Sequence, residues 1–135
     1  MATVFEMIIK GDIPSVKLYE DDLCLAILDI NPVEKGHTLV ISKNVYPTFQ
    51  EAPEKTLSHM FEVAKKLEKK MREELKCDGS NILINNGKAS GQEVPHLHIH
   101  VIPRYFNDNQ EFGFTHKPYT DDKEKTEMGK KLRLS

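Results

Sequence analysis

The feature that most constrains the fold is a strict alternation of histidine and apolar residues, HLHIHVI, over residues 96–102. Side chains at alternate positions of a β-strand point to the same face of the sheet. Three imidazoles would therefore line one face. The intervening Leu97, Ile99 and Val101 would point to the other face, where they need cover from an apolar surface. The alternation predicts a strand over this range that contributes to a site and to a hydrophobic core on opposite sides.

A long amphipathic helix beginning at Pro53 could supply that cover. Proline is tolerated in the first turn of a helix, because its missing N–H would have no partner there. Lysines and glutamates on the opposite side of the predicted helix indicate a solvated face, and Asp78-Gly79 is expected to end it. Apolar residues recur at helical spacing at Leu57, Met60, Phe61, Ala64, Leu67, Met71 and Leu75.

Short runs elsewhere in the chain predict the remaining elements. Residues 4–9 form a short apolar run that ends at Lys10-Gly11, which is typical of a helix C-terminus. Few helical segments are available to connect parallel strands. We therefore predict an α+β domain: a five-stranded antiparallel sheet with one long helix packed on one face and a short N-terminal helix. Alternating or β-branched runs predict the four further strands at residues 16–20, 23–28, 37–41 and 81–85.

Length and composition indicate one domain over residues 1–135, with a polar, weakly patterned C-terminal tail from about residue 105. No apolar run approaches the roughly 20 residues of a membrane-spanning helix, and we see no secretory signal. The formal net charge of −2 does not supply the basic field that would draw the chain to nucleic acid or to a membrane. Cys24 and Cys77 stand far apart, which fits a reducing compartment. We predict a cytoplasmic location.

Two chemistries could use the three histidines on one strand face. Alternate histidines can ligate zinc from one side, although no cysteine or further histidine stands at a compact spacing beside them. The loop over residues 85–94 favours a different ligand, since its two glycines let backbone N–H groups approach an anion closely. The spacing alone does not decide between a zinc site and an anion site, and a third alternative is that the three histidines are simply exposed on an open sheet face.

Three segments, GQEVPHLHIHVIPR, DINPVEKGHTLVI and MIIKGDIPSVKLYEDD, together resemble the histidine triad family, in its nucleoside phosphoramidase-like branch. The resemblance runs from about Phe5 to Arg104. It implies that His98 is the nucleophile. It also places His96, His100 and, on an earlier strand, His37 around it.

The resemblance further implies which residues contact a nucleotide. Asp29 matches the position of a group that binds the ribose hydroxyls, and Ile30 follows it. Glu93 stands where phosphoramidase relatives often have serine, which puts the preferred leaving group in doubt. Each apolar residue of the base pocket could equally be core. The phosphate and ribose loop is assigned to Asn85, Gly91, Gln92 and Glu93, and the base pocket to Phe5, Ile8, Ile27 and Ile30.

The activity implied is hydrolysis at the α-phosphorus of a purine nucleoside phosphoramidate, a small-molecule nucleotide, through a covalent nucleotidyl-histidine and without a cofactor or metal. Thr3, Glu6 and Val45 stand where some relatives have structural zinc ligands, so we expect no such zinc. Relatives are usually homodimers, which makes a homodimer the expectation here. The alternatives are hydrolysis of dinucleoside polyphosphates, or a nucleotide-binding or partner-binding scaffold with incidental hydrolysis.

Overall fold

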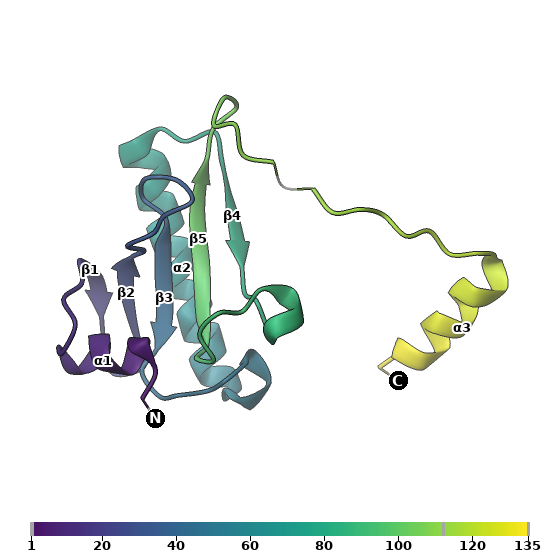
Figure 1. The fold of residues 1–135 in the computed structure, drawn as a ribbon, viewed down its shortest axis with the longest axis horizontal. Helices are drawn as coiled ribbons and strands as arrows, with labels where there is room; N and C mark the ends of the chain where they lie inside the picture. The colour runs from purple at the N-terminus through teal and green to yellow at the C-terminus, as the bar shows by residue number, and fades with distance from the viewer. Residues whose placement is uncertain (1, 112, 135) are drawn as a thin grey trace.

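The computed structural model describes residues 2–111 and 113–134. Its centre is a five-stranded sheet with the spatial order β1-β2-β3-β5-β4, in which every neighbouring pair is antiparallel. Figure 1 shows a helix on each side of this sheet and a further helix at the end of an extended arm. The predicted fold class is confirmed. The strands are β1 (Lys17–Glu20), β2 (Cys24–Leu28), β3 (Thr38–Ser42), β4 (Gly79–Leu83) and β5 (His98–Arg104).

The two helices on the sheet begin and end for local reasons. Helix α1 (Val4–Lys10) has a reciprocal cap, in which the Thr3 hydroxyl accepts from the Glu6 N–H and the Glu6 carboxylate accepts from the Thr3 N–H. It ends at Gly11, whose φ of 90° is a left-handed conformation that glycine adopts without strain. Helix α2 (Glu54–Leu75) starts directly after Pro53, as predicted. Two short 3-10 turns, η1 (Phe49–Glu51) and η2 (Lys88–Ser90), lie in loops.

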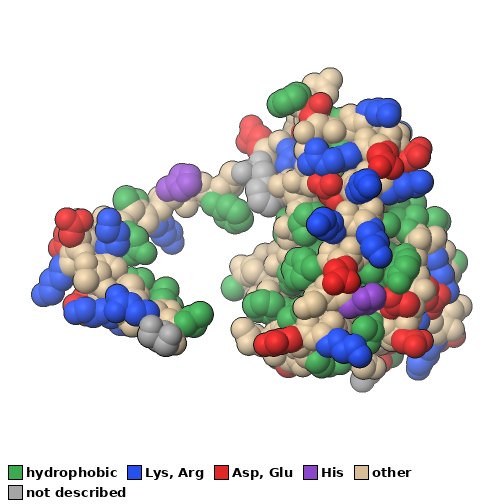
Figure 2. Space-filling model, turned by 180° about the vertical axis from the view of Figure 1, so that it is seen from behind, with side chains coloured by type: hydrophobic (Ala, Val, Ile, Leu, Met, Phe, Trp, Pro, Cys, Tyr) green, Lys and Arg blue, Asp and Glu red, His purple; other side chains and the backbone are tan. Residues whose placement is uncertain are grey.

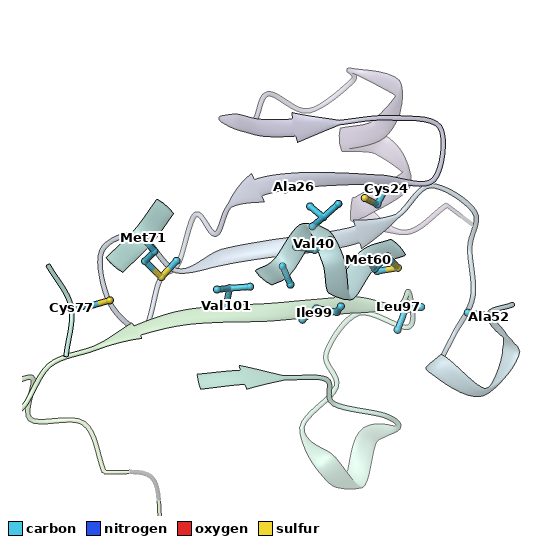
Figure 3. Close-up of a cluster of buried hydrophobic side chains, with 12 residues drawn as sticks. Cys24, Ala26, Val40, Ala52, Met60, Met71, Cys77, Leu97, Ile99 and Val101 are labelled. Carbon is cyan, nitrogen blue, oxygen red and sulfur yellow. The ribbon is translucent and has the colours of Figure 1, made fainter. Parts of the chain in front are cut away.

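Helix α2 covers one face of the sheet and forms the larger core with it. Figure 3 shows Val40, Ile99 and Val101 of the central strands packed with Met60 and Met71 of this helix. All five are at most 7% exposed. The apolar residues that alternate with the histidines therefore have the cover that the sequence predicted.

Helix α1 covers only part of the opposite face. Phe5 and Ile8 of this helix pack on Leu25 and Ile27 of β2, and with residues of β3 they form a second buried cluster. In Figure 1 the helix lies over the β1–β3 side of the sheet, and β5 and β4 continue beyond it. The same face of the sheet is thus closed on one half and open on the other.

Two predicted strands are displaced by two residues in the structure. Strand β4 begins at Gly79 rather than residue 81, because Gly79 pairs with Arg104 and lengthens the ladder at that end. Strand β5 begins at His98 rather than His96, whose N–H donates to the Val94 carbonyl in the preceding loop. The apolar pattern predicted which residues face each side of the sheet, but it did not predict where these two strands begin.

The C-terminal segment contains a helix that the sequence did not predict, α3 (Asp122–Leu132). The Asp121 carboxylate accepts from the Glu124 N–H at the first turn of this helix. Lysines occupy its last turn, where their positive charge interacts favourably with the helix dipole. Figures 1 and 2 both show this helix standing apart from the body of the protein. None of the described helices combines the length and the apolar character that crossing a bilayer requires.

Candidate active site

The open half of the sheet face holds a cavity of about 460 Å³ into which the histidine strand points. It forms where α1 stops covering the sheet, so that the floor is β5 and one wall is the edge of α1. His98 and His100 are on the floor and His37 lies at the start of β3. The lining residues are Phe5, Asp29, Ile30, Asn31, Val33, His37, Leu39, Asn85, Gly91, Glu93, Val94, His98 and His100.

The imidazole of His98 is oriented by the backbone of its own strand. Its Nδ1 lies 2.7 Å from the carbonyl oxygen of His96. A carbonyl can only accept, so in the neutral ring Nδ1 carries the proton and Nε2 is left with a free lone pair. The Phe5 ring stands edge-on to the imidazole, with the ring centroids 4.8 Å apart, and limits its rotation. His98 thus has the tautomer that a nucleophile needs.

His37 and His100 form a second pair whose tautomers are also set by the backbone. The Val33 N–H donates to Nδ1 of His37 at 3.1 Å, so this nitrogen is unprotonated. The proton of the neutral His37 ring is then on Nε2, which lies 3.0 Å from Nδ1 of His100. His100 accepts through Nδ1 and must carry its own proton on Nε2. An N–H donor therefore stands beside the lone pair of His98, and the two ring centroids are 4.8 Å apart.

His96 departs from the expectation of three strand imidazoles in one cavity. It is fully buried behind the Phe5 ring and does not line the cavity. Its Nε2 donates to the carbonyl of Ser42 at 2.7 Å, and the Thr3 hydroxyl donates to its Nδ1 at 3.0 Å. His96 therefore holds the strand and helix α1 together behind the site, while His37 takes the third place at the cavity.

Burial keeps these imidazoles neutral. Loss of contact with water lowers the pKa of His37, His96 and His98 below that of a free imidazole. The pKa of His100 falls to about 4, because burial is reinforced by the neighbouring His98 and His37. The Asp29 carboxylate opposes these shifts at His37, His98 and His100. A neutral cluster supplies one lone pair and one N–H side by side.

Asp29 is positioned at the end of β2 by two backbone contacts. Its N–H donates to the His37 carbonyl at 2.9 Å, and its carboxylate accepts from the Asn31 N–H at 2.9 Å. The carboxylate lies 3.7 Å from Nε2 of His37. The ligand atoms of Asp29, His37 and His100 all lie within 4.8 Å of one another, so they could converge on a metal ion if the proton between the two rings were lost.

The positions of the zinc ligands of some relatives serve another purpose in this chain. Thr3 and Glu6 form the cap of α1, and Val45 is an exposed apolar residue that offers no ligand atom. This donor set does not fit a zinc ion.

Comparisons with known proteins show the family of this chain. A family model described as HIT domain matches residues 10–107, which is more than half of the chain. The chain belongs to the histidine triad family. It is 45% identical over 105 residues to an adenylylsulfatase of Arabidopsis thaliana, covering 78% of this chain and 53% of that protein. It is 41% identical over 113 residues to an adenosine 5'-monophosphoramidase of Schizosaccharomyces pombe, covering 84% and 80%.

Solved structures of the family have the same fold. A HIT family protein of Bacillus subtilis superposes with a TM-score of 0.82 at 39% identity, covering 100% of both chains. A zinc-bound histidine triad family protein of Mycobacterium smegmatis gives a TM-score of 0.77 at 40% identity, covering 93% of this chain and 89% of that one.

The glycine-rich loop of this histidine triad protein is braced by Gln92. The Gln92 side chain accepts from the Gly87 N–H at 2.7 Å and donates to the carbonyls of Pro47 and Val94 at 2.6 and 3.0 Å. Gly91 has a φ of 101°, which favours glycine. The N–H groups of Ser90, Gly91 and Gln92 all donate within the loop. The predicted phosphate cradle therefore does not consist of these three donors, and Gln92 shapes the loop from outside the cavity.

The base-pocket residues expected from the family resemblance separate into two pairs. Phe5 and Ile30 line the cavity, and the Ile30 side chain is 91% exposed. Ile8 and Ile27 lie in the buried cluster beneath α1 and do not line the cavity. They support Phe5 from below.

Several residues of the site were missed in the sequence. Asn31, Leu39 and Val94 line the cavity, and Thr3 and Val33 orient histidines. Val33 acts through its backbone N–H, which no side-chain pattern can reveal. Thr3 has a recognisable signal as a helix cap, since Glu6 follows three residues later, but its contact with His96 spans 93 positions of the chain.

Proposed function

We propose that this protein hydrolyses purine nucleoside phosphoramidates at the α-phosphorus, with a compound like adenosine 5'-monophosphoramidate as substrate and His98 as the nucleophile. The observation that carries this proposal is the tautomer of His98, whose Nδ1 is held by the His96 carbonyl at 2.7 Å so that the Nε2 lone pair is free beside the cavity. A nucleophile activated by its surroundings is the basis of covalent catalysis. The similarity to the adenosine 5'-monophosphoramidase of Schizosaccharomyces pombe supports the choice of substrate.

The nucleotide would lie along the cavity from the edge of α1 to β5. The apolar side chains of Phe5 and Ile30 suit a purine ring, and the Asp29 carboxylate, at the rim of the same cavity, suits the ribose hydroxyls. The phosphoryl oxygens would then face the Nε2–H of His100 and the amide of Asn85. Neutral donors of this kind stabilise developing charge without reorganising.

The reaction has two steps that reuse the same ring nitrogen. Nε2 of His98 forms a bond to phosphorus as the phosphorus–nitrogen bond breaks, and the departing nitrogen keeps the bonding electrons and takes a proton from solvent. Water then attacks the adenylyl group, loses a proton to solvent, and returns the lone pair to His98. The net change is a phosphoramidate and water giving a nucleoside monophosphate and an amine.

The experiment that tests this proposal is mass spectrometry of the protein after brief exposure to adenosine 5'-monophosphoramidate. We expect one adenylyl group, which peptide mapping assigns to His98. Steady hydrolysis without adenylylation at any point of a quenched time course would contradict the covalent route. No turnover of this substrate by the intact protein would contradict the proposed activity itself.

The alternative is a metal-dependent mechanism, because the ligand atoms of Asp29, His37 and His100 lie within 4.8 Å of one another. In the structure His37 and His100 satisfy each other with a hydrogen bond of 3.0 Å, which supports catalysis without a metal. We therefore expect dialysis against EDTA to leave the hydrolysis rate unchanged. Loss of activity that added zinc restores would favour the metal-dependent route.

The proposed assembly is a homodimer through β4 and α2. Strand β4 is an edge of the sheet, and an exposed edge strand is open to pairing with another copy. Beside this strand lies a depression of about 280 Å³ to which Phe61 and Ile82 contribute. These two apolar side chains are 45% and 41% exposed, so a second copy could cover them. Sedimentation should give twice the chain mass. The free, buried thiols of Cys24 and Cys77 support the proposal of a cytoplasmic location.

A further inference from the structure

A second cavity, of about 310 Å³, adjoins the nucleotide cavity along β5 and β4. The two cavities share Val33, His37, Asn85 and His100, so the histidine pair forms part of the wall of both. Nothing in the proposed placement of the nucleotide fills the second cavity. Its remaining lining residues are Asn81, Leu83, Ile102, Arg104, Gln110 and Glu111.

The direction of the proposed reaction points into this second cavity. His98, His100 and Ile102 are at alternate positions of β5, so they lie on one face at intervals of about 6.6 Å. A phosphoryl group whose phosphorus faces Nε2 of His98 and whose oxygen accepts from the His100 N–H would lie over the two rings, whose centroids are 4.8 Å apart. In an in-line displacement the departing group is opposite the attacking nitrogen, which places it on the His100 side, where the second cavity begins.

The chemistry of the second cavity disfavours an anionic group. Its floor is the apolar pair Leu83 and Ile102, next to the Asn81 side chain, and Glu111 stands at the rim. Arg104 is the one lysine or arginine among the described residues that line either cavity. Its guanidinium is already committed, because it donates to both carboxylate oxygens of Asp108, to the Asn81 side chain and to the Gln110 carbonyl.

We propose that this second cavity, the leaving-group cavity, binds the side chain of the departing amine and selects apolar or cationic amines over anionic ones. The inference rests on the proposed function and extends it to the leaving group. The same electrostatic argument disfavours sulfate and polyphosphate leaving groups, which need unpaired cationic side chains. Glu111, Glu93 and Asp29 give the combined cavities three carboxylates against one paired arginine.

The leaving-group cavity is also connected to the histidine tautomers. The Gln110 side chain donates to the Val33 carbonyl at 3.0 Å, and the Val33 N–H sets the tautomer of His37. The wall that would contact the amine is thus attached to the loop that orients the His37 and His100 pair.

The test uses three adenosine phosphoramidates whose amines have the same chain length and differ only at the far end. The amines are hexylamine, 1,5-diaminopentane and 6-aminohexanoate, so that the terminal group is apolar, cationic or anionic while the reacting nitrogen is unchanged. Single-turnover rates of adenylyl-His98 formation are expected to be about fivefold higher for the cationic than for the anionic substrate. The later release of the nucleotide should proceed at one rate for all three, because the chain has then departed.

Two variants connect this selectivity to the cavity. Glu111→Lys should reverse the preference between cationic and anionic chains, with each rate divided by that of the same variant on the unsubstituted phosphoramidate. Glu73→Lys makes the same charge change on the exposed side of α2 and should leave the preference unchanged. Leu83→Phe fills the floor of the cavity and should lower the relative rate with the hexylamine substrate about tenfold.

The possible outcomes separate the two proposals. Adenylylation of His98 by the unsubstituted phosphoramidate, with equal rates for all three longer substrates, would overturn the leaving-group cavity and leave the proposed activity standing. Absence of adenylylation with every substrate would overturn the proposed activity. A preference that Glu111→Lys and Leu83→Phe both fail to alter would show that selectivity arises elsewhere and would also overturn the cavity assignment.

Discussion

The sheet face that carries the histidines has two halves that differ in how they are covered, although both belong to one continuous antiparallel sheet. Over β2 and β3, helix α1 covers the apolar side chains and closes a core. Over β5 and β4 the same face is open and carries two cavities. Phe5 belongs to both halves, since it is part of the buried cluster and of the cavity wall. The sheet pattern thus decides which residues can line a site, and the length of a short helix decides which of them do.

The row of histidines crosses the boundary between these halves. His96 lies on the covered side, His98 at the boundary and His100 on the open side. The carbonyls of Ser42 and His96 set the tautomers of His96 and His98, and the Val33 N–H sets that of His100 through His37. The covered half therefore orients the open half.

Replacing His98 with asparagine should abolish chemistry on the open half without disturbing the covered half. We expect His98→Asn to lower kcat by roughly 10⁴-fold, equivalent to about 5.5 kcal/mol in activation free energy. The melting temperature should stay within a few degrees of the wild-type value. Hydrolysis near the wild-type rate would refute the assignment of the nucleophile.

A substitution beneath α2 should have the opposite signature. Met60 is fully buried in the larger core, so Met60→Ala should lower the free energy of unfolding by about 2–5 kcal/mol, as measured in urea. The specific activity of the folded fraction should be retained, because Met60 lies on the other face of the sheet. Lys66→Ala, which changes an exposed residue of the same helix away from the proposed dimer contact, is the matched control. A loss of activity greater than the loss of folded protein would show that the faces are coupled.

Thr3 tests whether the covered half orients the nucleophile. Thr3→Val keeps the shape of the side chain and removes both the cap of α1 and the donor to Nδ1 of His96. We expect kcat to fall about tenfold through misplacement of His98, with a stability loss of about 1 kcal/mol. Thr3→Ser restores the hydroxyl and should restore kcat. If Thr3→Val lowered the stability as expected but left kcat unchanged, Thr3 would act only as a helix cap.

The smallest expected effect is that of mild acid on activity. Burial lowers the pKa of His98, so kcat/KM should fall less between pH 7.5 and 6 than the loss of about three-quarters expected for the neutral form of an imidazole with the ordinary pKa of about 6.5. A midpoint near 6.5 in the kcat/KM profile would contradict the account.

The free energy of unfolding should respond to acid more than the rate does. The unfolded chain takes up protons on its histidines near pH 6.5, while the fold keeps them neutral and the pKa of His100 is about 4. Between these values the unfolded state binds more protons, so stability is full above pH 6.5 and falls as the pH drops toward 4. Urea titrations at several pH values measure this loss.

Much of the architecture could be predicted because it depends on periodicity. The alternation over residues 96–102 placed Ile99 and Val101 under α2, and the spacing after Pro53 located that helix. The family resemblance suggested roles for the histidines and for Asp29, which the periodicity could not, and these roles stay predictions. Helix α3 was missed because its apolar residues are too few to give a pattern, and every described residue in it is exposed.

The finer geometry of the site lay beyond the sequence for a physical reason. The alternation predicted that His96 shares a cavity with His98 and His100, but His96 precedes the strand and turns behind Phe5. Its partners, the Ser42 carbonyl and the Thr3 hydroxyl, come from segments 54 and 93 positions away. Contacts made by backbone groups across such separations leave no mark on the residue pattern.

The central claim, that backbone groups fix the histidine tautomers, can be tested directly by NMR of the isotope-labelled ring nitrogens in the free protein at neutral pH. We expect a proton on Nδ1 and none on Nε2 for His98, with the reverse arrangement for His37, His96 and His100. Finding His98 protonated on Nε2, or doubly protonated, would leave no lone pair facing the cavity and would contradict the account.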